Sequence, residues 1–361
     1  VGCSALLVWL CFTTESRPQG AGVWEGLKWL AAGLLLYVSH ALCFVVGVVW
    51  LVLSGTVLQR SLRGTAVHLL YLLPLFVATW FWYPMLSTSS MATPPLWVST
   101  PLDRVSFSWL SDAALGGLKG PVESIVFGIM LAWIAVGIVQ NRRALSGSAD
   151  RSLLLAGCLF LVLSLVLPDK YMNTIRFGQR WVPLGMIMIL LAVPAPACKP
   201  ITPRVVAVAT VAAFCAAVSS AWLSFERKEL SGLQQALDAL PASSRVLGLA
   251  FVQESDYVKG FPFIQTFAYS QVLKGGTLNF SFAEFSPCLV VYKKPFVRPW
   301  TGGLEWFPRR VEESDLDHFD HALICADDDF HSRWARHPRI APVTGTGRWR
   351  LYRILPESNV R

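Results

Sequence analysis

Three basic residues, Lys170, Arg176 and Arg180, lie just before an apolar run and are the clearest candidates for chemistry in this sequence. Arg176 and Arg180 are four positions apart, so on a helix they would share one face above the run that begins at Trp181. Guanidinium groups in that place suit a phosphate at a membrane surface. The alternative is that these side chains only extend toward lipid headgroups, with Asp169 as the salt partner of either arginine.

Candidate acids precede this group in the long connection after Leu86. Transfer of a group from a phosphate ester needs a base near the acceptor and cations near the leaving group. Asp103 and Asp112 are the candidate catalytic carboxylates, and Arg104 beside Asp103 is a candidate phosphate ligand. The alternative for Asp112 is a place in the first turn of a capped helix over residues 111–118.

Metal-capable side chains gather near the C-terminus without a recognised metal-binding pattern. His318, His321, Cys325 and His331 match none of the standard zinc spacings. We therefore expect a strand followed by an acidic turn, predict no metal site, and leave dependence on a divalent cation open.

The amino-acid composition indicates whether the chain folds mainly in water or in a lipid bilayer. Of 361 residues, 54% are hydrophobic and only 15% are charged, with 15 Trp and 21 Phe. Soluble domains carry about 25% charged residues. This composition excludes a disordered chain, a coiled coil, a collagen and a small disulfide scaffold, and it favours a lipid bilayer as the main solvent.

Charge divides the chain near Phe225. Residues 1–223 hold 14 basic and 7 acidic groups, whereas residues 224–361 hold 17 and 16. The second density is usual for a water-facing domain. We predict a transmembrane domain over residues 1–225 and an α/β domain over residues 226–361. The near-neutral second part lacks the basic stripe of a nucleic-acid-binding protein, so no nucleic-acid partner is expected.

The first part contains seven apolar runs that are candidates for helices crossing a hydrocarbon core. These are Val1–Phe12, Trp29–Leu53, Gly64–Leu86, Ser124–Gln140, Ser152–Leu167, Trp181–Ala195 and Val205–Leu223. The sequence therefore predicts an α-helical transmembrane bundle of about seven spans followed by a small extracytoplasmic α/β domain. Val1–Phe12 covers about half a span, and we expect it to be a truncated helix; the alternative is a chain that begins at a processed terminus.

The loops predict the orientation. Three short connections rich in Arg and Lys are assigned to the cytoplasm, namely Ser54–Arg63, Asn141–Arg151 and Pro196–Arg204. The alternate connections hold the other acids and are assigned to the outer side, namely Thr13–Lys28, Ser87–Glu123 and Pro168–Arg180. The C-terminal domain then lies outside, where a disulfide between Cys288 and Cys325 is one interpretation and two buried thiols the other.

The C-terminal part shows the alternation of an α/β sheet. Helices are predicted over Glu226–Leu240 and Phe263–Lys274, the second ending at Gly275-Gly276. Strands are predicted over Arg245–Phe251, Leu289–Tyr292, Ala322–Cys325 and Trp349–Ile354. Glycine-rich nucleotide-binding loops are absent from the sequence after these strands.

Three segments resemble bacterial polytopic membrane proteins related to the GT-C class of glycosyltransferases. They are LLLYVSHALCFVVGVVWLVL, LPDKYMNTIRFGQRWVPLGMIMILLA, and the tail LDALPASSRVLGLAF…FIQTFAYSQVLKGGTLNFSF…FDHALIC…GRWRLYRI. The resemblance implies a bacterial inner-membrane protein with a polyprenyl-phosphate-linked sugar as donor and an acidic catalytic residue in the first outer loop. That loop offers Glu15 and Glu25 but no aspartate.

Two other functions remain as alternatives. A non-catalytic membrane scaffold that binds a partner or a glycan is favoured by the missing aspartate. A transporter is less favoured, because its helices would carry charges or breaks at mid-membrane. Histidines within apolar runs also merit a functional hypothesis; for His40 and His68 the alternative is a neutral ring hydrogen-bonded to another helix.

Overall fold

The computed structural model describes residues 2–15, 22–87, 94–141, 148–171, 174–196, 201–284, 292–293 and 297–357. The chain forms two compact units. The first comprises Val1–Leu115 and Phe127–Val205, and the second Gly116–Val126 and Val206–Arg361. The long helix before the charge boundary at Phe225 thus belongs mainly to the second unit, together with a short segment from the connection before residue 127.

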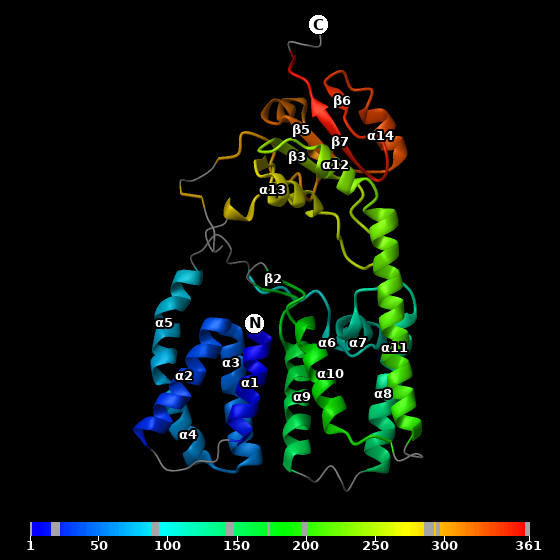
Figure 1. The fold of residues 1–361 in the computed structure, drawn as a ribbon. Coiled ribbons are helices and arrows are strands. Elements are labelled where there is room, and N and C mark those ends of the chain that lie inside the picture. Colours follow the sequence, from blue (N-terminus) through cyan, green and yellow to red (C-terminus); the bar gives the residue numbers. More distant parts are fainter. Residues whose placement is uncertain are drawn as a thin grey trace. The chain divides into compact units, whose positions relative to one another are not determined.

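The first unit is helical (Figure 1). Its helices are α1 (Gly2–Glu15), α2 (Val23–Ser39), α3 (Ala41–Leu53), α4 (Leu62–Tyr71), α5 (Leu73–Ser87), α6 (Pro101–Arg104), α7 (Phe107–Leu115), α9 (Ser148–Val166) and α10 (Val182–Ala192), with most of α8 (Val122–Gln140). A π-helical segment, η1 (Ser54–Leu58), extends α3, and a 3-10 turn, η3 (Gln179–Trp181), precedes α10. A two-stranded ribbon, β1 (Lys170–Tyr171) and β2 (Thr174–Ile175), follows α9.

Among the described residues, three helices are long and apolar enough to cross a membrane. They are Ala41–Leu58, Val122–Gln140 and Thr202–Glu229. A fourth candidate is the pair α4 and α5, which is bent by 57° between Tyr71 and Leu73. The predicted span Gly64–Leu86 is therefore a bent helix pair, and α1, α9 and α10 are shorter apolar helices.

The predicted single span Trp29–Leu53 is wrong, because the chain reverses at His40. The backbone of His40 is extended, with φ −173° and ψ 116°, and separates α2 from α3. Across the reversal the rings of Tyr37 and Phe44 pack edge to face at 5.3 Å, and α2 and α3 lie side by side (Figure 1). The 31 uncharged residues between Lys28 and Arg60 would form a helix of about 47 Å, well beyond a core of about 30 Å.

This reversal also corrects the side assigned to the first connection. The Nε2 of Gln59 donates to the carbonyl oxygen of Thr13 at 3.4 Å, and the indole N–H of Trp50 donates to the hydroxyl of Thr13 at 2.9 Å. The connection Thr13–Lys28 therefore starts at the same end of the first unit as Ser54–Arg63, because the reversal adds one pass. The loop pattern had placed these two connections on opposite sides, whereas the structure places both at one end of the first unit.

Tryptophan side chains form the centre of the first unit. Trp9, Trp29 and Trp50 are almost completely buried. Trp9 packs edge to face on Trp29 at 5.6 Å, and the Trp29 ring stacks on His68 at 4.0 Å. The indole N–H of Trp9 donates to the carbonyl oxygen of Gly47 at 3.0 Å, so a buried polar group is satisfied where α1 meets α3.

The second unit is an α/β structure. It contains α11 (Ile201–Ser224, mostly in this unit), η4 (Phe225–Glu229), α12 (Leu233–Ala239), β3 (Arg245–Ala250), η5 (Thr266–Ala268), α13 (Tyr269–Lys274), β4 (Thr277–Leu278), η6 (Phe282–Glu284), η7 (Pro308–Arg310), η8 (Glu313–His318), β5 (His321–Cys325), α14 (Asp328–Trp334), β6 (Ile340–Pro342) and β7 (Trp349–Ile354). The strand order is β4-β3-β5-β7-β6. The strands β4, β3 and β5 are parallel, whereas β7 is antiparallel to both β5 and β6.

Three predicted strands of this part are confirmed as β3, β5 and β7. The predicted helix Glu226–Leu240 is interrupted, because Gly232 has φ +84° in a turn before α12. The short strands β4 and β6 and the helix α14 were not predicted. Cys288 and most of the predicted strand Leu289–Tyr292 lie outside the described residues, so the proposed disulfide is not described; Cys325 is buried in β5.

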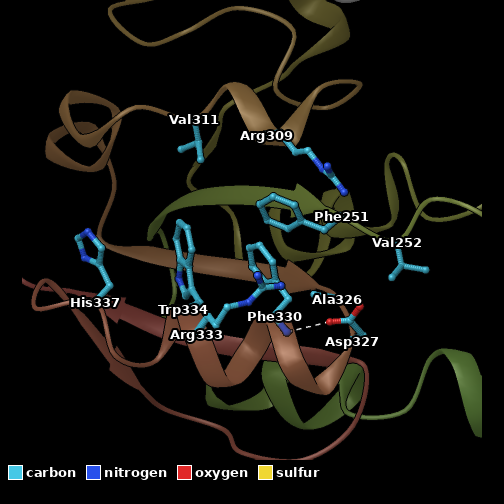
Figure 2. Close-up of a pocket in the computed structure, with 10 residues that line it drawn as sticks. All are labelled: Phe251, Val252, Arg309, Val311, Ala326, Asp327, Phe330, Arg333, Trp334 and His337. Atoms are coloured by element: carbon cyan, nitrogen blue, oxygen red, sulfur yellow. Dashed lines mark hydrogen bonds between the residues drawn. The ribbon is translucent and has the colours of Figure 1, made fainter.

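A pocket of about 530 Å³ lies in this unit at the carboxyl ends of β3 and β5 (Figure 2). Phe251 and Val252 line it directly after β3, and Ala326 and Asp327 line it directly after β5. None of the residues that line this pocket was predicted as a site residue.

Candidate functional site

The predicted site residues lie in two connections of the first unit that are hydrogen-bonded to each other. The N–H of Leu96 donates to the carbonyl oxygen of Lys170 at 2.9 Å, and the N–H of Lys170 donates to the carbonyl oxygen of Leu96 at 3.1 Å. The segment that contains Asp103, Arg104 and Asp112 is thereby attached to the segment that contains Lys170, Arg176 and Arg180. The sequence alone gave no sign of this pairing, because the two segments are about seventy residues apart.

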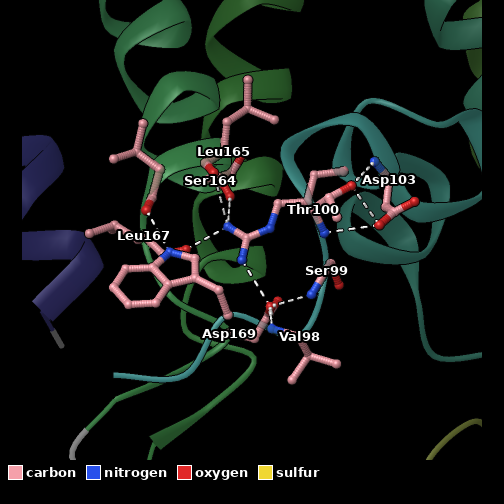
Figure 3. A network of polar contacts seen from close by, with 11 residues as sticks. Val98, Ser99, Thr100, Asp103, Ser164, Leu165, Leu167 and Asp169 are labelled. Carbon is pink, nitrogen blue, oxygen red and sulfur yellow. Dashed lines mark hydrogen bonds and ion pairs between the residues drawn. The ribbon is translucent and has the colours of Figure 1, made fainter. Parts of the chain in front are cut away.

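Arg104 is completely buried and binds the end of α9, where Figure 3 labels Ser164, Leu165 and Leu167. Its Nη1 donates to the carbonyl oxygens of Ser164 at 2.9 Å, Leu165 at 3.1 Å and Leu167 at 2.5 Å. The last carbonyl groups of a helix have no partner within the helix, and a cation there is also favoured by the helix dipole. Gly178 allows this packing, since a Cβ at that position would lie 3.0 Å from the Ser164 carbonyl oxygen.

Asp169 completes the same network. Its Oδ2 lies 2.9 Å from Nη2 of Arg104 and accepts hydrogen bonds from the N–H groups of Val98 at 2.7 Å and Ser99 at 2.9 Å. Arg104 is thus a clamp between two connections, and its guanidinium is not available for a phosphate. The predicted role of Arg104 in substrate binding is therefore wrong in this structure: a fully buried cation with four protein acceptors has no room for a ligand.

Asp103 has a structural role at the start of α6. Its Oδ2 accepts from the hydroxyl of Thr100 at 2.7 Å and from the N–H of Thr100 at 2.9 Å. The Asp103 N–H in turn donates to the Thr100 hydroxyl at 3.2 Å, which makes a capping box. The hydrogen bond from the Thr100 hydroxyl, and then that from its N–H, hold the pKa of Asp103 below its usual range. A carboxylate with a lowered pKa is a weaker proton acceptor.

Asp112 lies in α7, half-buried, rather than in the first turn of a helix beginning at residue 111. The helix starts earlier, at Phe107.

The predicted helical face of Arg176 and Arg180 does not exist. Arg176 is in the left-handed region with φ +54°, and Arg180 lies in the 3-10 turn η3. Lys170 is in the ribbon strand β1, paired opposite Ile175. Of the two arginines, Arg180 lines the cavity described next.

That cavity, of about 200 Å³, lies in the first unit where the reversal at His40 meets the turn before α10. Arg180, exposed, lines it together with His40, also exposed. The remaining lining residues are Gly2, Cys3, Leu42, Cys43, Thr174, Phe177, Trp181 and Leu184. Among the described residues, the one hydrogen bond of the Arg180 side chain is a long one, of 3.4 Å, from Nη2 to the carbonyl oxygen of Ile175.

The His40 ring makes no hydrogen bond with any other described residue. The predicted alternative of a histidine bonded to a neighbouring helix therefore does not apply, and the ring is available at the cavity. His40 was predicted to lie within a single span, whereas it separates α2 from α3. Its position beside Arg180 follows from the extended backbone at residue 40, which carries the ring to the end of the helices.

Comparisons of the chain with protein families, with curated proteins and with solved structures find no match. The resemblance to GT-C glycosyltransferases therefore rests on the sequence segments alone.

Proposed function

We propose that this chain is an integral membrane protein that binds a polyprenyl-phosphate-linked sugar at the His40–Arg180 cavity and transfers the sugar, as the GT-C resemblance implies. The observation that carries the proposal is that an arginine and a histidine, 140 residues apart in sequence, line one cavity at the end of apolar helices. Of the two carboxylates predicted to be catalytic, Asp103 is engaged in a helix cap, and Asp112 lies half-buried in α7; neither lines this cavity.

The chemistry assigns one role to each side chain. The guanidinium of Arg180 would hold the phosphate through charge-assisted hydrogen bonds. As the acceptor oxygen forms its bond to the anomeric carbon, the C–O bond to the phosphate breaks, and its electron pair leaves with the phosphate. The proton of the acceptor hydroxyl passes to His40, since histidine is the commonest general base. Phe177, Trp181 and Leu184 supply an apolar wall for the first isoprene units.

The proposal includes the membrane arrangement. The short helices and the bent pair would complete the seven predicted spans, with one further pass added by the reversal at His40. The connections around Arg60 and Arg204 are rich in basic residues and would face the cytoplasm of a bacterial inner membrane. The connection Thr13–Lys28 would face the cytoplasm as well, because it starts at the same end of the first unit as Ser54–Arg63. The cavity and the C-terminal α/β domain would then lie on the outer side.

The second candidate is a non-catalytic protein that binds the same lipid or a glycan. A specific observation favours it: no carboxylate is among the described residues that line the cavity. GT-C chemistry, as the resemblance implies it, uses an acid.

The test is binding and turnover by the purified full chain in phospholipid vesicles that contain polyprenyl phosphate or polyprenyl-phosphate mannose or glucose. Arg180→Gln should weaken binding of polyprenyl phosphate by about tenfold or more, the loss of one charge-assisted contact. His40→Asn should leave binding unchanged and lower turnover by about 100-fold. Arg176→Gln, an exposed neighbour outside the cavity lining, is the matched control and should change neither.

Unchanged lipid binding by Arg180→Gln would overturn the proposal. Binding that depends on Arg180 without turnover of either sugar lipid would support the non-catalytic candidate instead.

A further inference from the structure

The pocket of about 530 Å³ in the second unit lies where open α/β sheets bind ligands. The strand β3 has β4 on one side and β5 on the other, all three parallel. The chain after β3 leads to β4 on one side, and the chain after β5 leads to β6 and β7 on the other. Connections that diverge in this way leave a crevice at the carboxyl ends of the two strands, and such switch points are the usual ligand sites.

The walls of this pocket are aromatic. The rings of Phe251 and Phe330 are 3.9 Å apart, and the rings of Phe330 and Trp334 are stacked at 5.8 Å. Figure 2 shows these three rings along one side of the pocket, with Val311 and Arg309 across from them. An aromatic wall of this kind suits a ligand that has a flat or apolar ring face.

The charged groups of the pocket favour an anion. The side chain of Arg309 makes no hydrogen bond or ion pair with any other described residue, and it lines the pocket. Among the described residues, the one ion-pair partner of Arg333 is the exposed Asp329, at 3.1 Å, and exposed pairs of this kind contribute little binding energy. The pocket's own carboxylate, Asp327, accepts the N–H of Phe330 at 2.8 Å and so caps α14. The guanidinium N–H groups of Arg309 and Arg333 can therefore donate hydrogen bonds to an anion in the pocket.

The turns at the two strand ends limit what kind of anion fits. Residues 251–255 and 326–328 contain no glycine, so the backbone cannot approach a diphosphate as it does in nucleotide-binding turns. The anion must be held by side chains, which suits a single phosphate or carboxylate on an arginine fork. A volume of about 530 Å³ lies within the range of small-molecule sites.

We propose that this pocket binds a sugar ring that carries a single phosphate or carboxylate group, with the ring against Phe330 and Trp334 and the anion on Arg309 and Arg333. The site belongs to the second unit and is separate from the proposed lipid-phosphate cavity. Its test uses water-soluble probes without lipid substrate, so its failure and that of the proposed transferase function are distinguishable.

The test is ligand-observed NMR and calorimetry on the purified full chain in detergent, with glucose 6-phosphate, glucuronate, neutral glucose and uridine monophosphate as probes. Glucose 6-phosphate or glucuronate should bind at least about tenfold more tightly than glucose, since one charge-assisted contact is worth about that factor. Arg309→Gln should weaken the acidic sugar by about tenfold. Arg310→Gln is the matched control, because Arg310 belongs to the same turn but stacks over Phe307.

Phosphate and carboxylate sugars serve as separate arms, and binding of either one supports the proposal. Absence of binding by both acidic sugars would overturn it. So would an equal effect of Arg309→Gln and Arg310→Gln, since that result indicates unspecific charge attraction. Binding of uridine monophosphate in the absence of binding by either sugar acid would replace the proposal with a nucleotide site.

Discussion

The ammonium group of Lys259 lies 2.8 Å from Oε2 of Glu123. Glu123 is almost completely buried, and its Oε1 also accepts the N–H groups of Gly117 and Leu118, both at 2.7 Å. Backbone pairing continues the contact, since the N–H of Lys259 donates to the carbonyl oxygen of Gly117 at 2.9 Å. One carboxylate thus attaches residues 116–126 to the α/β part of the second unit.

Glu123→Ala should lower the free energy of unfolding by about 3 kcal/mol, because three donors lose a buried acceptor at once. Thermal unfolding of the purified chain in detergent would measure the change. Glu254→Ala is the matched control: Glu254 pairs with Lys119 at 3.6 Å with both side chains exposed, and its removal should cost about 0.5 kcal/mol or less. Equal losses would contradict the anchoring role of Glu123.

Arg104→Lys should lower the free energy of unfolding by about 3 kcal/mol although the charge is kept. A single ammonium cannot reach the three carbonyl groups at the end of α9 and the Asp169 carboxylate together, as the forked guanidinium does. Arg176→Lys, at an exposed position, should have little effect on the same measurement. A double change of Arg104→Gln with Asp169→Asn should cost less than the sum of the two single changes, because the partners form one network.

Acid should weaken the second unit through His331. This buried ring is hydrogen-bonded to the Tyr352 hydroxyl at 2.8 Å and to the carbonyl oxygen of Arg348 at 3.0 Å. Burial lowers the pKa of His331 below 6.5, and burial lowers the pKa of His321 as well. Below pH 6.5 the unfolded chain therefore binds more protons than the folded chain, and the free energy of unfolding falls as the pH decreases.

Unfolding of the purified chain between pH 8 and pH 5 would measure this dependence. His331→Gln should flatten the curve between pH 6.5 and pH 5, and the buried His321, whose pKa is also lowered, should keep part of the slope. His318→Gln, on the 3-10 turn η8, is the control and should keep the wild-type slope. The role assigned to His331 fails if its substitution leaves the slope unchanged.

The reversal at His40 predicts which positions share one side of a membrane. In a chain without other cysteines, Lys28→Cys and Gln59→Cys should react with an impermeant thiol reagent from the same side of sealed vesicles. Arg176→Cys should react from the opposite side, because it belongs to the end of the first unit that includes His40 and Arg180. If Lys28→Cys and Arg176→Cys were labelled from the same side of the vesicles, that result would contradict the reversal at His40.

The sequence by itself determined the change in charge density near Phe225 and the three central strands of the α/β sheet. Both depend on local composition: the fraction of charged residues before Phe225 is below half its usual value, and the runs at β3, β5 and β7 are short, rich in apolar residues and bounded by turn residues. The strands β4 and β6 were not predicted, because strands of two and three residues are too short to show an alternating hydrophobic pattern.

Only the tertiary structure decided the site. An uncharged run gives no sign of where it turns back, so the reversal at His40 became visible only through the packing of α2 on α3. Arg104 and Arg180 are the same residue type in similar loops, yet one is fully buried against the end of α9 and the other lines a cavity. Which arginine can receive a ligand depends on carbonyl groups and side chains contributed by distant segments, and no local pattern contains that information.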